Sequence, residues 1–276
     1  MGRSISSGRV TVLGCGGSGG VPLIGNYWGL CDPHNPRNLR TRSSIHIMLD
    51  GFFSLQIDTG TDFRAQINRE TLTYIDSVFF THAHSDHVNG IDDLRYMAMI
   101  TQKIIPVYGH AATIDEIRGR FLYLFEHKEK LYKPLLTSHA WEDNAYNQPQ
   151  IHATDDINFT FTPIHQIHGN TFSIGYRFGN FAYSTDVSDF PLESLNALKG
   201  IDTWLVDCGQ YGQDFIEVHP NLERVMEWND IVGAKRVILT HLPVKADYNA
   251  MSASLPNHFE PAHDGQIIEI NFAPQS

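Results

Sequence analysis

One short stretch of this 276-residue chain limits what it can fold into: Thr81-His82-Ala83-His84-Ser85-Asp86-His87. It follows segment 77–80, whose aromatic and β-branched residues predict a short buried strand. A strand that ends in such a turn holds the side chains of the turn at the edge of a sheet. A polar surface loop is the alternative, but it does not account for four metal-binding side chains placed so close together.

The spacing within this stretch indicates two metal ions. In an extended segment, residues two apart point to the same side, so His82 and His84 can bind one ion. Asp86 and His87 follow in the turn and can bind a second. Imidazole and carboxylate ligands suit zinc, and also manganese or iron.

Composition narrows the class of protein. Hydrophobic residues make up 42% of the chain and charged residues 18%, which is typical of a soluble globular protein. No apolar run approaches the roughly 20 residues that a membrane helix needs, and the N-terminus does not read as a secretory signal. The three cysteines, Cys15, Cys31 and Cys208, are widely spaced and odd in number. They favour a reducing, cytoplasmic compartment over a disulfide framework.

The net charge of the chain limits the kinds of binding partner that we expect. A formal net charge of −11 argues against nonspecific nucleic-acid binding, which needs a basic surface. Two bound divalent cations would offset part of that charge. We therefore expect a small phosphodiester or nucleotide-like substrate and no membrane partner, and the sequence leaves a homodimer open.

Strand and helix patterns alternate in both halves of the chain, with no Gly/Ser-rich or Pro-rich linker between them. We expect one domain over residues 1–276, of α/β class (α+β by some schemes). Its expected architecture is a four-layer αββα sandwich in which two mixed sheets pack face to face with helices outside. The glycine-rich segment 14–22 is not followed by a helix, so it predicts a tight turn and not a dinucleotide-binding loop.

Several local expectations follow. Thr61 or Asp62 is a candidate helix cap. Segment 113–125 reads as one helix, and segment 126–150 reads as an irregular lid or insert. Four histidines fit no ligand spacing and are expected at the surface or in caps: His110, His127, His139 and His152.

Loop 26–42 carries three arginines. Arg37, Arg40 and Arg42 either form a basic lip that meets substrate phosphate or belong to a solvated loop. Arg42 directly precedes a strand and is the one we retain as a candidate for substrate binding.

Other strand ends offer further ligands. An apolar strand ends in Asp186, and segment 238–241 repeats the pattern of apolar strand, threonine and histidine at His241. His165 and His168 lie near a third strand end, and spacing does not choose between them. Asp58, at the end of a neighbouring strand, can hydrogen-bond a metal ligand or satisfy turn backbone.

Taken together, these motifs resemble those of the metallo-β-lactamase-fold hydrolases. They occur in the family's order over nearly the whole chain: Leu13-Gly14, Gly19-Gly20-Val21-Pro22, Asp58-Thr59-Gly60, Thr81–His87, His168-Gly169, Ser184-Thr185-Asp186 and Leu239-Thr240-His241. Within that family the chain looks most like the phosphodiesterase branch. Phosphoribosyl cyclic phosphate phosphodiesterases are the nearest in pattern, and tRNA 3′-processing endonucleases are more distant.

The resemblance implies a role for each of these residues. One metal ion, zinc or manganese, is expected on His82, His84 and His168, and the other on Asp86, His87 and His241, with Asp186 bridging both. Asp86 is also the residue expected to orient the nucleophilic water. His219 is a candidate general acid, and a surface histidine at a helix start is the alternative.

One departure from the family concerns a structural zinc. Related phosphodiesterases often hold it with three cysteines and a histidine. Here only Cys31 remains, while Asn26, Trp28 and Val244 occupy the other three positions. We therefore predict no third metal.

The function expected from all this is hydrolysis of a small, in some cases cyclic, phosphodiester by a hydroxide shared between two metal ions. Thioester or lactone hydrolysis at the same site is the alternative, as is tRNA 3′-end cleavage. A redox di-iron centre is disfavoured because it needs a carboxylate at the position of His84. A metal-stabilised RNA-binding module is disfavoured by the acidic charge.

Overall fold

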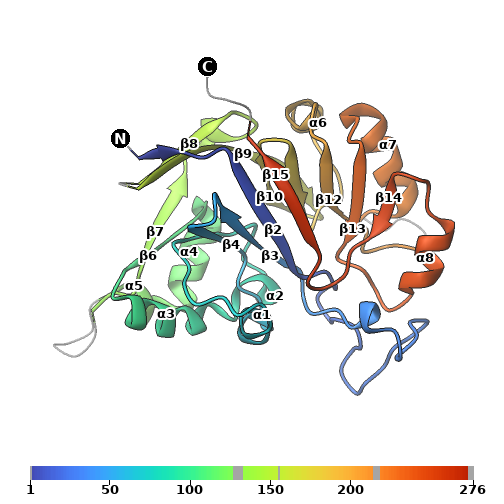
Figure 1. The fold of residues 1–276 in the computed structure, drawn as a ribbon, viewed down its shortest axis with the longest axis horizontal. Coiled ribbons are helices and arrows are strands. Elements are labelled where there is room, and N and C mark those ends of the chain that lie inside the picture. Colours follow the sequence, from blue (N-terminus) through green and yellow to red (C-terminus); the bar gives the residue numbers. More distant parts are fainter. Residues whose placement is uncertain (1, 127–132, 155, 214–217, 273–276) are drawn as a thin grey trace.

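The structure is a computed structural model that describes residues 2–126, 133–154, 156–213 and 218–272. Two β-sheets pack face to face, and helices cover the outer face of each (Figure 1). This is the expected αββα arrangement, and the mixed character of both sheets is confirmed. No helix among the described residues is long and apolar enough to cross a membrane.

The first sheet has seven strands in the order β15-β2-β3-β4-β5-β6-β7. Pairing is parallel from β4 to β7 and antiparallel elsewhere. The strands are β2 (Ser7–Gly14), β3 (Ser44–Leu49), β4 (Phe53–Ile57), β5 (Ser77–Phe79), β6 (Ile105–His110), β7 (Leu136–Trp141) and β15 (Ile267–Asn271).

The second sheet has the order β1-β9-β10-β11-β12-β13-β14, with β8 paired to β9. Here β11 to β14 are parallel. The strands are β1 (Arg3–Ser4), β8 (Gln150–Ala153), β9 (Ile157–His168), β10 (Thr171–Phe178), β11 (Phe181–Ser184), β12 (Thr203–Asp207), β13 (Arg236–Thr240) and β14 (Phe259–Pro261).

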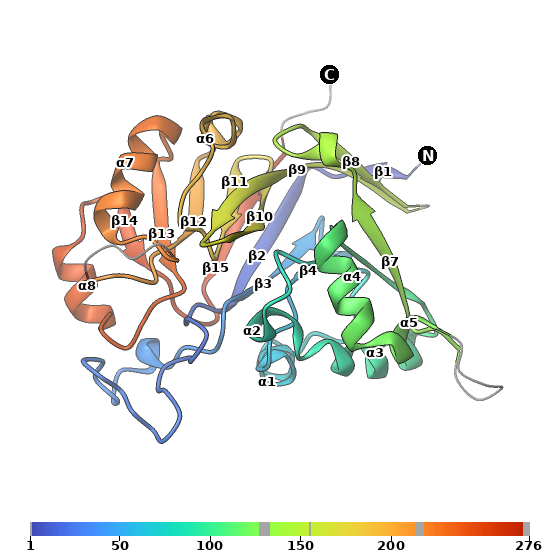
Figure 2. The ribbon, with the colours of Figure 1, turned by 180° about the vertical axis from the view of Figure 1, so that it is seen from behind.

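Helices from the first half lie against the first sheet and those from the second half against the second sheet (Figures 1 and 2). The α-helices are α1 (Phe63–Arg69), α2 (Ser85–Val88), α3 (Leu94–Thr101), α4 (Ala111–Arg120), α5 (Leu122–Phe125), α6 (Leu192–Leu198), α7 (Leu222–Val232) and α8 (Tyr248–Ser254). Short 3-10 turns are η1 (Pro36–Asn38), η2 (Ile91–Asp93) and η3 (Asp143–Ala145).

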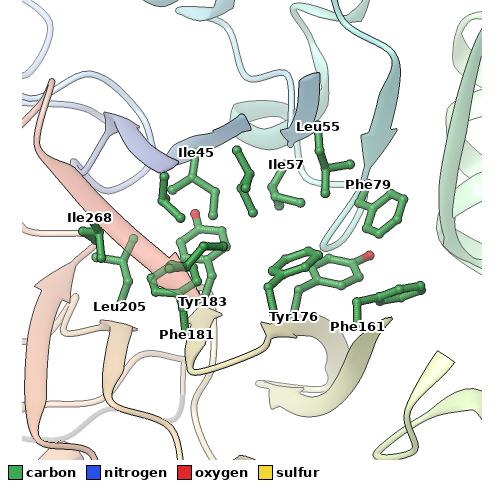
Figure 3. Close-up of a cluster of buried hydrophobic side chains, with 14 of the residues drawn as sticks. Ile45, Leu55, Ile57, Phe79, Phe161, Tyr176, Phe181, Tyr183, Leu205 and Ile268 are labelled. Carbon is green, nitrogen blue, oxygen red and sulfur yellow. The ribbon is translucent and has the colours of Figure 1, made fainter. Parts of the chain in front are cut away.

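The core between the sheets is built from alternate residues of facing strands. Ile57 and Phe79 of the first sheet meet Phe161, Tyr176 and Tyr183 of the second, all essentially inaccessible to solvent (Figure 3). Burying such side chains stabilises the fold by roughly 1.5–3 kcal/mol each. The loops that follow the parallel strands β5, β11 and β13 come together at one edge of the two packed sheets.

Two local expectations were wrong, and a third was met only in part. Residues 136–141 form edge strand β7 and not an irregular insert; the sequence signal was weak because an edge strand covers few of its side chains. The expected helix over 113–125 breaks at Phe121, just after Gly119, which weakens a helix. Asp62 stands at the start of α1 but makes no side-chain capping bond.

The expectation that His152 lies at the surface or in a cap was wrong: it is buried in the core, where it contacts Phe53, Phe79 and Phe159. His110 caps α4 by accepting a bond from the backbone N–H of Ala112, as a capping role requires. His139 lies near the surface and stacks on Tyr108, and His127 lies outside the described residues.

Candidate metal centre

The residues expected to bind metal come from strand ends in both sheets. His82 and His84 follow β5, and Asp86 and His87 lie on the single turn of α2. The second sheet contributes its ligands from the ends of three strands: His168 ends β9, Asp186 follows β11 and His241 follows β13. The structure brings all seven of these side chains together, although 159 positions separate the first from the last.

They form two groups that share Asp186. The first group is His82, His84, His168 and Asp186; the second is Asp86, His87, Asp186 and His241. In each group the candidate ligand atoms all lie within 4.8 Å of one another.

Distances to Asp186 show how the shared carboxylate sits between the groups. Its Oδ1 lies 3.8 Å from His168 Nε2 and 3.9 Å from His82 Nε2. Its Oδ2 lies 3.0 Å from His87 Nε2, and His241 Nε2 is 3.4 Å from Oδ1. Oδ1 thus faces imidazole nitrogens from both sheets, and Oδ2 faces His87 from the first sheet.

The donor atoms fit divalent cations. The Nε2 atoms of His82, His87 and His241 are buried and have no hydrogen-bond partner among the described residues. A buried polar atom without a partner costs roughly 1–3 kcal/mol, so three aimed at one carboxylate require a common partner. Nitrogen and carboxylate donors in groups of four match the ligand sets of zinc and manganese.

Burial holds the pKa of His82 well below its ordinary value and keeps the imidazole neutral, as a metal ligand must be. At His87, burial acts in the same direction, but the carboxylates of Asp186 and Asp58 outweigh it and raise the pKa. A cation held by His87 would replace the proton on Nε2, which faces Asp186, while Nδ1 would keep its proton toward Asp58.

Asp58 holds the candidate ligands in position through hydrogen bonds. Its Oδ2 accepts a 2.7 Å hydrogen bond from His87 Nδ1 and a 2.8 Å bond from the Thr81 hydroxyl. The same hydroxyl lies 3.0 Å from His82 Nδ1, so one buried carboxylate orients one ligand from each group. The hydrogen bond from His87 also fixes which ring nitrogen faces the cluster.

Three residues of the centre have a left-handed backbone although none is glycine. The φ angles are 61° at Asp58, 53° at Asp186 and 57° at His241. This conformation is uncommon for residues with a side chain, and it concentrates at functional sites where the surrounding structure enforces it. Asp58 and His241 directly follow strands β4 and β13, and Asp186 comes two residues after the end of β11. The sharp turn at each position aims the side chain along the edge of the sheet.

Asp207, which ends β12, was not among the site residues predicted from the sequence. Its Oδ2 lies 2.8 Å from His219 Nδ1, and the His219 ring stacks on that of His241 with centroids 4.4 Å apart. Burial acts to lower the pKa of His219, but the Asp207 carboxylate outweighs it and raises the pKa to about 9. The available signal was an apolar strand ending in a carboxylate, the same pattern that pointed to Asp186.

The arginines of the long loop have structural partners. Arg42 forms an ion pair with Asp62 at 2.9 Å, and its Nε donates to the carbonyl of Ser18. Arg40 is buried, contrary to both readings of the loop, and donates to the carbonyl of Ala246. Its guanidinium also lies 3.8 Å from Cys31 Sγ, so the positive charge of Arg40 lies beside that cysteine.

Two face-to-face sheets with a shared histidine and aspartate cluster at one edge define a metal-dependent hydrolase. The chain belongs to the Beta-lactamase superfamily domain family, whose model matches residues 55–242. That range contains every proposed ligand from His82 to His241.

Solved structures and a curated relative are similar to the chain. A diphosphatase of the PhnP family is 29% identical and superposes with a TM-score of 0.84, covering 97% of this chain and 99% of the other. The short form of human tRNase Z is 17% identical with a TM-score of 0.65 over 94% and 98% of the two chains, which shows the fold alone.

An octanoyltransferase of Porphyromonas gingivalis is 29% identical over 258 residues. The match covers 93% of this chain and 50% of the relative, so this chain spans about half of that relative's length.

Proposed function

We propose that this protein hydrolyses a small phosphodiester, cyclic or linear, or a diphosphate, with two divalent ions, zinc or manganese, bound by the two groups. The observation that carries the proposal is the sharing of Asp186 between two four-residue ligand groups. The similarity to a diphosphatase of the PhnP family supports a phosphoryl substrate. Bound at these groups, divalent cations supply Lewis acidity and an acidified water as nucleophile.

The chain's own residues perform the remaining tasks. Asp186 holds the two groups together with its two oxygens. The carboxylate of Asp86 is partly exposed and lies 3.4 Å from His87 Nε2, so it faces the cluster from the solvent side and can orient water or accept a proton. Burial of His82, His87 and His241 excludes bulk water from the rest of the centre.

His219 is placed to protonate the leaving oxygen. Its Nδ1 is bonded to Asp207, which fixes the ring and leaves Nε2 for the substrate. The ring lies beside two ligands, with centroids 4.4 Å from His241 and 5.4 Å from His168. A general acid in this position supports the departure of an alkoxide, which is a poor leaving group near pH 7. We also propose that Arg42, held in place by its ion pair with Asp62, contacts the substrate phosphate.

A second candidate function is thioester hydrolysis, which the relative named octanoyltransferase favours. That relative is about twice as long as the matched region, so its named activity can reside in the part that this chain lacks. We also propose a reducing, cytoplasmic setting, since Cys15, Cys31 and Cys208 are all free and buried.

The test is hydrolysis of methyl p-nitrophenyl phosphate and of octanoyl-N-acetylcysteamine by protein loaded with zinc or manganese. We expect cleavage of the phosphodiester, lost on chelation and in Asp186→Asn. Cleavage of the thioester alone would replace the first proposal by the second. The control is Asp92→Asn, which changes a partly exposed carboxylate away from the centre.

A further inference from the structure

Helix α3 is apolar on two faces. Its inner face is buried between the helices and the first sheet by Leu94, Met97 and Ala98. On its outer face Tyr96, Met99 and Ile100 follow the i, i+3, i+4 spacing of one helix stripe, and they are 70%, 62% and 60% exposed. A surface helix normally turns polar residues outwards. No residue that the structure describes covers this second apolar stripe, so the stripe calls for a partner outside the chain.

The apolar surface continues on both sides of the stripe. Ile104, just beyond α3, is 52% exposed. Between α1 and α3, which lie side by side outside the first sheet (Figure 1), is a groove of about 650 Å³. The apolar residues that line this groove are Phe63, Ile67, Leu72, Tyr96, Met97 and Ile100.

The patch is large enough for a specific contact. Tyr96, Met99, Ile100 and Ile104 together expose on the order of 500 Å², which is in the upper range for a single apolar patch on a monomer. Each partner in a standard interface buries roughly 800 Å², and the walls of the groove add to the area of the stripe.

The charges around the patch cancel. Three acidic and three basic residues lie on it or beside it: Asp76, Asp92, Asp93, Arg64, Arg95 and Lys103. Asp92 pairs with Arg95 at 3.5 Å, and Asp76 pairs with Lys103 at 3.7 Å. The chain as a whole carries a formal net charge of −11, so two copies repel each other in most orientations. At this neutral patch that repulsion is weakest.

We propose that the outer face of α3 and the adjoining groove form the contact surface of a homodimer. In a two-fold dimer the same patch lies on both subunits, so it must be complementary to itself. An apolar ridge beside an apolar groove meets this requirement, because the ridge of each copy packs into the groove of the other. The proposal is independent of the reaction catalysed at the metal centre.

The charges favour one orientation of the two copies. Asp92 and Asp93 directly precede α3, and Lys103 follows it. When the two α3 helices pack antiparallel, the acidic start of each helix lies near the basic end of the other. Complementary charges at both ends then fix the register of the contact.

The first test measures the dimer dissociation constant by sedimentation equilibrium. We expect the wild type to be a dimer, and Ile100→Asp to raise the dissociation constant at least a hundredfold, because it places an unpaired carboxylate in an apolar contact. The matched control is Ile24→Asp, which changes a fully exposed isoleucine on another surface and should leave the constant unchanged. A monomeric wild type, or a dimer that Ile24→Asp dissociates and Ile100→Asp does not, would overturn the proposal.

The second test uses charge reversal and does not depend on the stability of one variant. One double variant carries Asp92→Lys and Asp93→Lys, and the other carries Arg95→Glu and Lys103→Glu. Each should self-associate at least tenfold more weakly than the wild type, since like charges then meet across the contact, while an equal mixture should form mixed dimers. Wild-type self-association of either variant alone, or the absence of mixed dimers, would contradict the proposed surface.

Discussion

Gln166 donates a 2.8 Å hydrogen bond from Nε2 to the hydroxyl of Ser173, and that hydroxyl donates at 2.7 Å to the backbone carbonyl of Asp186. The first sheet has a counterpart: Gln56 Nε2 donates to Ser44 Oγ at 2.7 Å and to the carbonyl of Asp58 at 2.7 Å. In both sheets a buried glutamine–serine pair thus holds the carbonyl of a left-handed aspartate.

The first prediction concerns the pair formed by Gln166 and Ser173. Ser173→Ala removes the donor to Asp186, so we expect a loss of about 1–2 kcal/mol in unfolding free energy and weaker retention of metal, because the shared carboxylate is less well fixed. Metal content after dialysis against a chelator and urea denaturation measure the two effects. Ser194→Ala is the control, since the Ser194 hydroxyl is buried without a partner in the part of the chain that the structure describes. Normal metal retention in Ser173→Ala would contradict the prediction.

The second prediction concerns Arg120 of α4. Its Nη1 donates at 2.6 Å to the carbonyl of Ala83, between His82 and His84, and its Nη2 donates to Asn89 Oδ1 just after α2. One guanidinium thereby braces both ends of the ligand turn. Arg120→Met should raise the dissociation constant for metal about tenfold, as measured by competition with a fluorescent chelator.

Arg118→Met is the matched control for this change. Arg118 lies on the same helix and binds Ser138 and Glu126, away from the ligand turn. Equal metal affinities in the two variants would show that Arg120 does not position the ligands.

The third prediction addresses the role of His219. With p-nitrophenolate as leaving group, which needs no proton, His219→Gln should reduce kcat less than tenfold. With an alkoxide leaving group, such as the 3′-oxygen of a dinucleotide, the loss should reach about 10²–10⁴-fold. A plot of log kcat against leaving-group pKa gives the comparison, and parallel lines for the variant and the wild type would exclude general acid catalysis.

The fourth prediction concerns acid stability. Burial lowers the pKa of His152 to about 4 and that of His46 to about 4, against about 6.5 for an unfolded chain. Between these values the unfolded state binds protons that the folded state does not. The contribution of these neutral histidines to the unfolding free energy is therefore fully present above pH 6.5. It falls as the pH decreases towards 4, by up to about 3 kcal/mol for each histidine.

His152→Phe should flatten this dependence, because the ring lies among Phe53, Phe79 and Phe159 and its removal leaves one fewer group to protonate on unfolding. At pH 5 we expect the variant to lose about 2 kcal/mol less than the wild type, relative to pH 7.5. Unfolding free energies at both pH values give the result. Ser77→Ala, which removes only the hydroxyl near His152, should keep the original slope.

Sequence patterns predicted the two-sheet architecture because apolar alternation and strand-end motifs are local signals. They did not reveal that β15, at the end of the chain, pairs with β2, since no local pattern specifies a partner 260 residues away. Asp207 was missed for the same reason: a carboxylate at a strand end becomes part of a site only when the fold brings His219 to it. Spacing alone also did not decide between His165 and His168, and the structure places His168 near Asp186 and His165 beside Tyr146 and Phe172.

The pairing of β15 with β2 sets where the chain can be extended. Asn271 lies opposite Ser7, while β2 ends at Gly14, three residues before Gly17, which lies against His241. The eight residues of β2, a length of roughly 25 Å, separate Ser7 from Gly14. The ends of β2 and β15 that lead to the two termini thus lie on the side of the molecule remote from the proposed metal centre, so a covalently attached partner there can be gained or lost without obstructing the approach of substrate.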